Sequence, residues 1–231
     1  MKAIDSIINK TKAEQVYRRL KASILKGEIS PGEKLVINKL AEHFQTSIIP
    51  VREALSRLEA ESMVTVVAHT GVYVKEIDID QLREIYPVRG ILEGYAARLA
   101  TEHITIEDLE FLNQHICKMD EAIAAKDDTL MGRLNIEFHK RIYAMSGNQT
   151  LTCLIDDMWQ KTFFARLVFK FTPHRAKTSN KEHRTIVESL KKGNSKRVET
   201  LIIRQSTKTL KLLNNYMEKK KRDDLRHSSQ Q

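Results

Sequence analysis

The sequence predicts a mainly α-helical protein in two parts: an N-terminal winged helix–turn–helix of three helices plus a β-hairpin wing, then an all-α helical bundle. Apolar residues recur at three- and four-residue intervals along most of the 231 positions, which is the period of amphipathic helices. Only residues 63–75 alternate like two strands around a turn. The 8 Gly and 4 Pro are few for a fold made of many strands. We therefore expect strands only in this one hairpin.

The first helix is predicted over residues 12–26. Val16, Leu20 and Ile24 recur every four residues and form one apolar stripe. Gly27 follows the last apolar position, where glycine commonly ends a helix. This helix therefore has one face to bury against its neighbours.

Two short helices follow, with the spacing of a helix–turn–helix over residues 37–56. Ser47 is a good N-cap for the second of them, and Pro50 falls in its first turn, where a missing N–H costs little. The apolar residues of this second helix recur on one face. Arg52 and Ser56 are therefore expected on the opposite, outward face.

Beyond Ile77 the pattern is helical almost to the end of the chain. We predict a head of residues 1–76, a helical domain of residues 80–222, and a polar tail of residues 223–231 that is disordered. The expected helices of the C-terminal half cover residues 149–171, 180–192 and 195–219.

The chain is basic, with a formal net charge of +9. Residues 161–222 hold 18 of the 39 Lys and Arg but only 4 of the 30 Asp and Glu. Such a surplus is typical of a protein with an anionic partner, although a solvated helix face explains the same run. No apolar run approaches the roughly 20 residues of a membrane span, and two cysteines are too few for a disulfide scaffold. We expect no membrane partner and a reducing, cytoplasmic setting.

The outward face of the second short helix suits double-stranded DNA. Arg52 can make the bidentate guanine contact that is the commonest specific base contact. Ser47 and the backbone N–H groups beside it suit a phosphate. The start of the preceding helix and the tip of the hairpin can touch the flanking backbone. The candidate DNA-binding residues are Asn38, Lys39, Ser47, Ile48, Ile49, Arg52, Ser56, Arg57, His69, Thr70 and Gly71.

These residues belong to a longer pattern over residues 12–75. It comprises Gly-Glu-Ile-Ser-Pro-Gly-Glu-Lys-Leu from Gly27, Leu40-Ala41, Ser47, Pro-Val-Arg-Glu-Ala-Leu from Pro50, Leu58-Glu59 and Gly71. The pattern resembles the GntR family of bacterial transcription regulators. The resemblance implies that Asn38, Ser47, Arg52 and the wing tip touch an operator.

Ile48 and Ile49 depart from that family, in which many members have Arg-Thr before the proline. Apolar side chains cannot donate hydrogen bonds, but they can touch a thymine methyl group. Alternatively, both pack against the wing and contact no base. If they reach DNA, the departure predicts an operator different from that of arginine-bearing relatives.

The helical domain carries a second pattern. It comprises Tyr-Pro-Val-Arg-Gly-Ile-Leu-Glu from Tyr86, Ala-Ala-Arg-Leu-Ala from Ala96, Glu137-Phe-His139, Ser146-Gly-Asn148, Leu151 and Glu182-His183. The pattern resembles the FCD effector domain of the FadR-type branch of the same family. Members often bind a divalent metal through one Asp and three His, and the metal helps to hold a carboxylate effector. The corresponding positions here are Asn135, His139, His183 and Gln205.

Two of these four positions are amides, which are weaker, neutral ligands than carboxylate or imidazole. One interpretation is a divalent metal, Zn, Ni or Mn, held by all four residues. The other is a metal-free pocket that binds a small effector, such as an organic acid, through the same side chains, with Arg89 or Arg166 meeting its carboxylate. The candidate effector-binding residues are Arg89, Asn135, His139, Arg166, His183 and Gln205.

The sequence contains no nucleophile elbow, phosphate-binding glycine loop or His-Glu-x-x-His motif, so we expect no enzyme. The resemblance implies a ligand-responsive, sequence-specific DNA-binding transcription regulator. We expect a repressor that binds a pseudo-palindromic operator as a homodimer, because one head covers only a few base pairs. A metal-dependent hydrolase built on His139 and His183 and a purely architectural DNA-binding protein are the alternatives.

Overall fold

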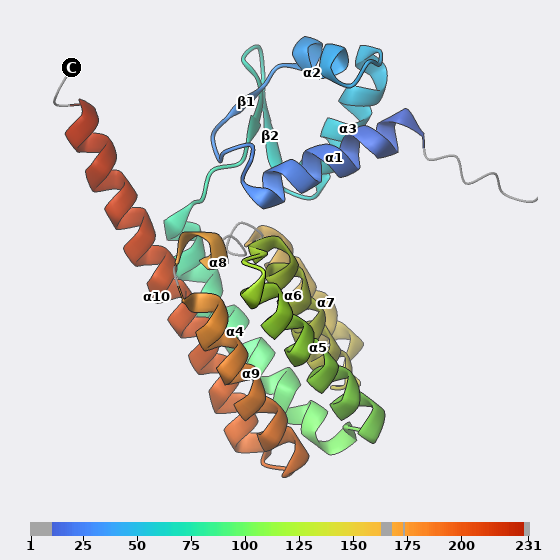
Figure 1. Ribbon diagram of the computed structural model, residues 1–231, viewed down its shortest axis with the longest axis vertical. Helices are drawn as coiled ribbons and strands as arrows, with labels where there is room; N and C mark the ends of the chain where they lie inside the picture. The colour runs from blue at the N-terminus through green and yellow to red at the C-terminus, as the bar shows by residue number, and fades with distance from the viewer. Residues whose placement is uncertain (1–10, 163–167, 173, 229–231) are drawn as a thin grey trace, which may run out of the picture. The chain divides into compact units, whose positions relative to one another are not determined.

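The computed structural model describes residues 11–162, 168–172 and 174–228. The chain divides into two compact units between Ile77 and Asp78 (Figure 1). The described part of the first unit holds helices and a small sheet, and that of the second holds helices alone. Among the described residues, no helix is long and apolar enough to cross a lipid bilayer.

Helix α1 (Lys12–Lys26) has the predicted bounds, and its ends are capped. The hydroxyl of Thr11 accepts a hydrogen bond from the backbone N–H of Glu14 at 3.2 Å. Gly27 closes the helix with a left-handed φ of 65°, which glycine adopts without strain. The apolar stripe is buried, as its period predicts.

The helix–turn–helix consists of α2 (Ile37–His43) and α3 (Ile48–Ala60). Helix α3 begins after Ser47, the expected N-cap. Its inward residues Val51, Ala54, Leu55 and Leu58 are almost completely buried. Helix α3 packs on both α1 and α2, so the orientation of its outward face is fixed by the core of the unit.

The sheet has one strand more than the sequence predicted. Strands β2 (Val64–Val67) and β3 (Gly71–Val74) form the wing, and β1 (Lys34–Leu35) pairs antiparallel with the free side of β3, giving the order β1-β3-β2 (Figure 1). The expectation of strands only in the hairpin was therefore wrong. Two residues are too few to show a strand period, and the pairing depends on Gly32, whose N–H donates to the carbonyl of Val74 at 2.9 Å.

The second unit is a bundle of helices (Figure 1). Helix α4 packs on α10, α6 and α7, while α5 packs on α6 and α9. Thr105 and Asp108 form the reciprocal capping box that starts α5. The elements are α4 (Ile79–His103), α5 (Ile106–Ala124), α6 (Asp128–Ala144), α7 (Gln149–Lys161), α8 (Val168–Phe171), α9 (Arg175–Lys191) and α10 (Ser195–Ser228).

Helices α4 and α10 approach closely because glycines stand at their contact. A methyl group at Gly94 would lie 2.8 Å from Cγ1 of Ile203, and one at Gly90 would lie 3.3 Å from Cβ of Ser206. Distances this short leave no room for a side chain on α4. Among the described glycines of the second unit, Gly94 and Gly90 leave the least space for a side chain, so α4 and α10 pack closely there.

Three helix bounds differ from those predicted. The helix expected over residues 149–171 is divided into α7 and α8, because α7 ends at Lys161 and Thr162 leaves the helical conformation; residues 163–167 lie outside the described residues. Helix α9 begins at Arg175 rather than near residue 180, after His174 in a left-handed turn. Helix α10 continues to Ser228, so the tail expected to be disordered is helical that far, since no Gly or Pro interrupts it.

Candidate functional site

The outward face of α3 is a coherent exposed surface in the first unit. Arg52 and Ser56 lie opposite the buried residues of α3 and are exposed. Arg52 makes no ion pair with any described residue. The hydroxyl of Ser47 makes no capping hydrogen bond to the described backbone, so it is free to bind a phosphate with the N–H groups at the start of α3. A rigid helix presenting an unpaired guanidinium fits the major groove of DNA.

Ile48 and Ile49 are exposed at the start of α3, by 42% and 76% respectively. They do not pack as core residues against the wing, which was one of the two interpretations of the sequence. Both side chains are therefore available to touch thymine methyl groups.

The wing tip is a tight turn between β2 and β3. His69 and Gly71 adopt positive φ values of 60° and 131°, and the hydroxyl of Thr70 donates to the carbonyl of Ala68 at 3.1 Å. A methyl group at Gly71 would lie 3.0 Å from Cε of Lys34. Lys34 therefore brings an ammonium group beside the wing. The sequence prediction missed Lys34, because its position next to the wing follows only from the pairing of β1 with β3.

Arg57 is the one predicted DNA-binding residue that the structure ties to another helix. Its Nη1 group donates to Oε2 of Glu14 at 2.6 Å, and its guanidinium lies 4.1 Å from the ring centroid of Tyr17. The hydrogen bond from Arg57 lowers the pKa of the Glu14 carboxyl. Arg57 thus joins α3 to α1, while the remaining candidates, from Asn38 and Lys39 to the wing, are exposed or half-buried.

The second unit contains a partly open cavity of about 70 Å³ among its helices. The volume is sufficient for a few water-sized groups. Its wall is polar and charged as well as apolar, which is typical of a site that orients a small ligand. The lining residues include Arg89 and Glu93 of α4, Asn135, His139 and Tyr143 of α6, Trp159 of α7, Arg175 and Ser179 of α9, and Gln205 of α10.

Arg89 and Glu93 form a buried ion pair in the wall of the cavity. Nε of Arg89 lies 3.1 Å from Oε1 of Glu93, and Nη1 donates to the hydroxyl of Thr162 at 2.7 Å. Trp159 Nε1 also donates to Glu93. Burial raises the pKa of the Glu93 carboxyl, and the charge of Arg89 opposes that rise. The pair fixes both side chains at the cavity wall.

The two histidines lie side by side but only one reaches the cavity. His139 lines it, and its Nδ1 lies 3.2 Å from the hydroxyl of Tyr143. Burial and two nearby guanidinium groups lower the pKa of His139 to about 3, so its ring is neutral. The ring of His183 lies 5.2 Å from that of His139 and 4.4 Å from that of Phe138, measured between centroids. His183 is completely buried and is not among the described lining residues.

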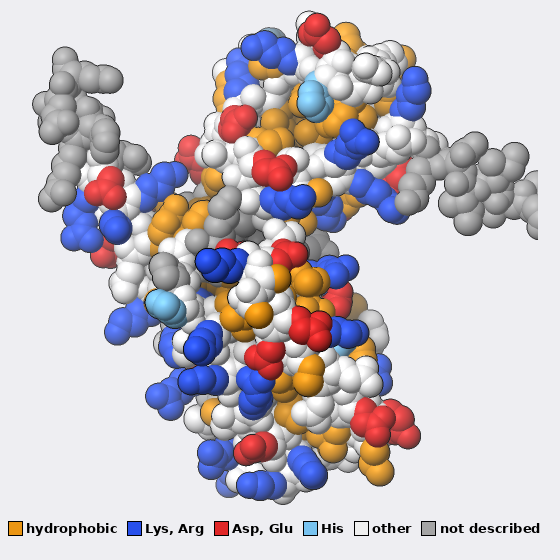
Figure 2. Space-filling view, in the orientation of Figure 1, with side chains coloured by type: hydrophobic (Ala, Val, Ile, Leu, Met, Phe, Trp, Pro, Cys, Tyr) orange, Lys and Arg blue, Asp and Glu red, His pale blue; other side chains and the backbone are white. Residues whose placement is uncertain are grey.

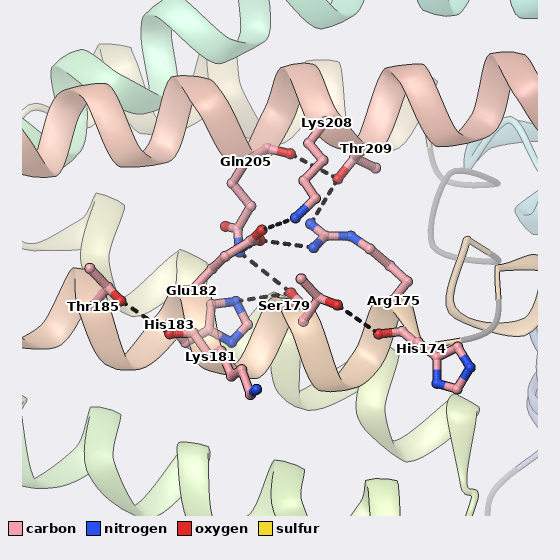
Figure 3. Close-up of polar contacts among 11 residues, drawn as sticks. His174, Arg175, Ser179, Lys181, Glu182, His183, Thr185, Gln205, Lys208 and Thr209 are labelled. Carbon is pink, nitrogen blue, oxygen red and sulfur yellow. Dashed lines mark hydrogen bonds and ion pairs between the residues drawn. The ribbon is translucent and has the colours of Figure 1, made fainter.

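A cluster of charges joins α9 to α10 beside the cavity (Figure 3). Glu182 accepts hydrogen bonds from Nη1 of Arg175 at 2.8 Å, from Nζ of Lys208 at 2.7 Å and from Nε2 of Gln205 at 3.1 Å. The nearby Arg175 charge and these hydrogen bonds hold the pKa of the Glu182 carboxyl below its usual value, although burial acts in the opposite direction. Glu182 is therefore ionised and shared by three donors.

The structure brings together four of the six predicted effector-binding residues. Arg89, Asn135, His139 and Gln205 line the cavity, His183 lies behind it, and Arg166 lies outside the described residues. The sequence prediction missed the rest of the wall. Glu93 stands four residues after Arg89, a spacing that indicates an ion pair on a helix; the other missed residues have no signal in the sequence. These are Tyr143, Trp159, Arg175 and Ser179.

Helix α3 presents an arginine outward beside a wing, and the helical bundle of the same chain contains a polar cavity. Together these features define a DNA-binding transcription regulator with a ligand-binding domain. Comparison with known families agrees: residues 12–74 match the bacterial regulatory proteins of the gntR family, and residues 84–205 match the FCD domain. The chain belongs to the GntR family, with a winged helix–turn–helix followed by an FCD domain. Neither the hydrolase nor the architectural alternative is supported.

Individual relatives are named as regulators. An uncharacterised HTH-type transcriptional regulator of Bacillus subtilis, YdhC, is 32% identical over 181 residues, which is 78% of this chain and 81% of that protein. The HTH-type transcriptional repressor GlaR of Escherichia coli is 38% identical over 84 residues, 36% of this chain and 38% of that protein. The solved structure of E. coli McbR/YncC superposes with a TM-score of 0.72 at 27% identity and covers 89% of this chain and 99% of that one.

The residues at the four positions that would hold a metal do not fit a divalent ion. Only His139 offers an imidazole to the cavity; Asn135 and Gln205 are amides, and His183 is set back from it. Within the described ranges, no group of three or more His, Cys, Asp or Glu side chains could hold a metal. Glu182, the carboxylate bonded to Gln205, already accepts hydrogen bonds from Arg175 and Lys208. Asn135 and Gln205 would be weak, neutral ligands, and the buried guanidinium groups beside them would repel a divalent cation.

Proposed function

We propose that this chain is a repressor that binds a pseudo-palindromic operator as a homodimer in the cytoplasm and is released when a small organic acid fills the cavity. The observation that carries the DNA-binding assignment is the outward face of α3, where Arg52 is unpaired among the described residues and the opposite face is buried. Repression needs only occupancy of the operator, and the relative GlaR is named a repressor.

Arg52 provides the direct test of base recognition. Replacing it with alanine removes a bidentate base contact, so discrimination between operator and random duplex falls by about 1–3 kcal/mol. Arg133→Ala is the matched control, because Arg133 is an exposed arginine of α6. Gel-shift titrations of both variants against the footprinted operator measure the effect. Equal discrimination by the two variants would remove Arg52 from the recognition set.

Ile48 and Ile49 support an operator that is read partly through thymine. Selection of binding sites from random duplexes should recover thymines at the positions that face the start of α3. A selected site read by guanine contacts alone, like that expected for arginine-bearing relatives, would contradict this part of the proposal.

Helix α4 carries the surface that best suits a second copy of the chain. Val88, Ile91 and Tyr95 recur at three- and four-residue spacing and are 48%, 62% and 38% exposed. They face away from the glycines that contact α10. A two-fold axis brings such a stripe against itself, as an operator with two half-sites requires.

The α4 stripe is tested by measuring mass in solution. Sedimentation should give a dimer for the unaltered protein and a monomer for Ile91→Glu, because the charge would be buried in the contact. Ile106→Glu is the control, since Ile106 is 72% exposed at the start of α5, away from the stripe. Monomeric unaltered protein, or a dimer in both variants, would exclude this surface.

The response to a ligand is a shift between two arrangements of the helices around the cavity. An effector that binds one arrangement better weakens operator binding by its differential affinity, for which about 1–3 kcal/mol is typical. Competition gel shifts with candidate organic acids measure this coupling. An operator affinity that no acid changes would restrict the proposal to constitutive repression.

A further inference from the structure

A groove of about 460 Å³ lies in the first unit between α1 and the turn that joins α2 to α3. On one side Lys12 and Arg19 line it, about two helical turns apart on one face of α1. On the other side lies the segment from His43 to Thr46. The described lining residues include no Asp or Glu, so this α1–α2 groove is basic and suits an anionic partner.

The basic side chains of α1 divide into paired and unpaired ones, and Figure 2 shows basic side chains along this helix. Three of the five make ion pairs with described carboxylates, and none of the three lines the groove; they are Arg18, Lys21 and Lys26. The other two, Lys12 and Arg19, are exposed and make no ion pair with any described residue. The cations of α1 that no described carboxylate neutralises are therefore the two that line the groove.

The groove is continuous with the surface of α3 that is proposed to bind DNA. Thr46, which lines the groove, directly precedes Ser47, whose hydroxyl and neighbouring N–H groups suit a phosphate. A recognition helix enters the major groove with its N-terminal residues, so the sugar–phosphate backbone at the edge of that groove passes beside the turn before the helix. The next phosphates of the same strand then reach Lys12 and Arg19. His43 is exposed on the other side of the groove and offers a ring N–H to the same backbone.

We infer that the α1–α2 groove is a separate phosphate-binding site of the head, in which Lys12 and Arg19 bind the backbone of one DNA strand beside the bases that α3 reads. The inference rests on the proposed DNA binding and adds contacts that fix the register of the protein on the duplex without reading its sequence. Ammonium and guanidinium groups make strong, charge-assisted hydrogen bonds to phosphate oxygens. The chain therefore covers more DNA than the base pairs that face Arg52.

Two double variants of the full chain test the groove. Lys12→Gln with Arg19→Gln removes its cations, whereas Arg18→Gln with Lys26→Gln is the matched control, because it removes the same charge from the same helix outside the groove. Gel-shift titrations use the footprinted operator and a random duplex at one salt concentration, since affinity for DNA depends on salt. A second set of operators carries a single methylphosphonate, which replaces one charged phosphate oxygen by a methyl group, at each position across and beside the footprint.

The groove variant should bind the operator and the random duplex more weakly than the unaltered protein, each by roughly tenfold, and so keep its preference for the operator. The control should bind both duplexes like the unaltered protein. At one or two neighbouring positions the methylphosphonate should weaken the unaltered protein but not the groove variant, because the contact is already lost there.

Three results would each overturn the inference: an equal loss of affinity in the control, a changed preference between operator and random duplex in the groove variant, or the same methylphosphonate pattern in both proteins. The last result needs no quantitative affinity, so it also decides the matter if the groove variant is less stable. The unaltered protein separates the two proposals. Preference for the operator together with any of these three results contradicts only this inference, whereas no preference for any sequence contradicts the proposed function.

Discussion

The α4–α10 contact predicts that two chemically identical substitutions have opposite effects. Alanine is more favourable than glycine inside a helix by about 1 kcal/mol, and this gain applies to Gly94→Ala in α4 and Gly132→Ala in α6. At Gly94 the new methyl group would meet Cγ1 of Ile203 at 2.8 Å and the carbonyl oxygen of Glu199 at 3.2 Å. At Gly132 the nearest described atom would be Cδ2 of Phe169 at 3.9 Å, an ordinary contact.

The clash at Gly94 decides whether the substitution by alanine stabilises or destabilises the protein. A backbone carbonyl cannot move without shifting α10, and overpacking of this kind costs about 1–3 kcal/mol. Gly94→Ala should therefore be neutral to about 2 kcal/mol less stable, and Gly132→Ala up to about 1 kcal/mol more stable. Urea unfolding followed by the fluorescence of Trp159 reports the helical unit alone. If Gly94→Ala proved as stable as Gly132→Ala, the contact between α4 and α10 would be looser than described.

Two other changes test the helical unit. Burial and nearby guanidinium groups lower the pKa of His139 from 6.5 to about 3. Between these two pH values the His139 ring therefore binds a proton in the unfolded chain but not in the folded protein. The stability that depends on His139 should be complete above pH 6.5 and fall by about 1.4 kcal/mol per pH unit as the pH drops towards 3. The pKa of His183 is lowered as well, mainly by burial, so His183 adds to the slope of the unaltered protein. The slope should be smaller in His139→Gln; an unchanged slope would assign the loss to other groups, His183 first among them. Thr105→Ala removes the capping box of α5 and should cost about 0.5–2 kcal/mol of unfolding free energy, whereas Thr200→Ala on an exposed face of α10 should cost less.

Features set by local chemistry were predicted correctly. The bounds of α1 follow from its apolar period and Gly27, and the start of α3 from Ser47. The division into a winged head and a helical bundle follows from the change of period near Ile77. Strand β1 and the break between α7 and α8 were missed because each depends on contacts between distant residues. Thr162 illustrates this: its hydroxyl accepts a hydrogen bond from Arg89, 73 positions away.

The candidate site was predictable only where spacing along one helix carries the information. Asn135 and His139 share a face of α6 and both line the cavity. Arg175 gave no signal, because the beginning of α9 lay outside the helix that the sequence predicted. Its partnership with Glu182 and Thr209 arises only when α9 packs on α10.

The exposed isoleucines at the start of α3 have a consequence for how the protein responds to ionic strength. Each phosphate neutralised by a cationic side chain releases counterions and steepens the dependence of affinity on salt by a slope of about 0.9. Ile48 and Ile49 release none, so the affinity of this protein for DNA should fall less steeply with salt than that of a relative whose residue there neutralises a phosphate. Substitution of deoxyuridine for thymidine, which removes only methyl groups, should weaken the complex instead.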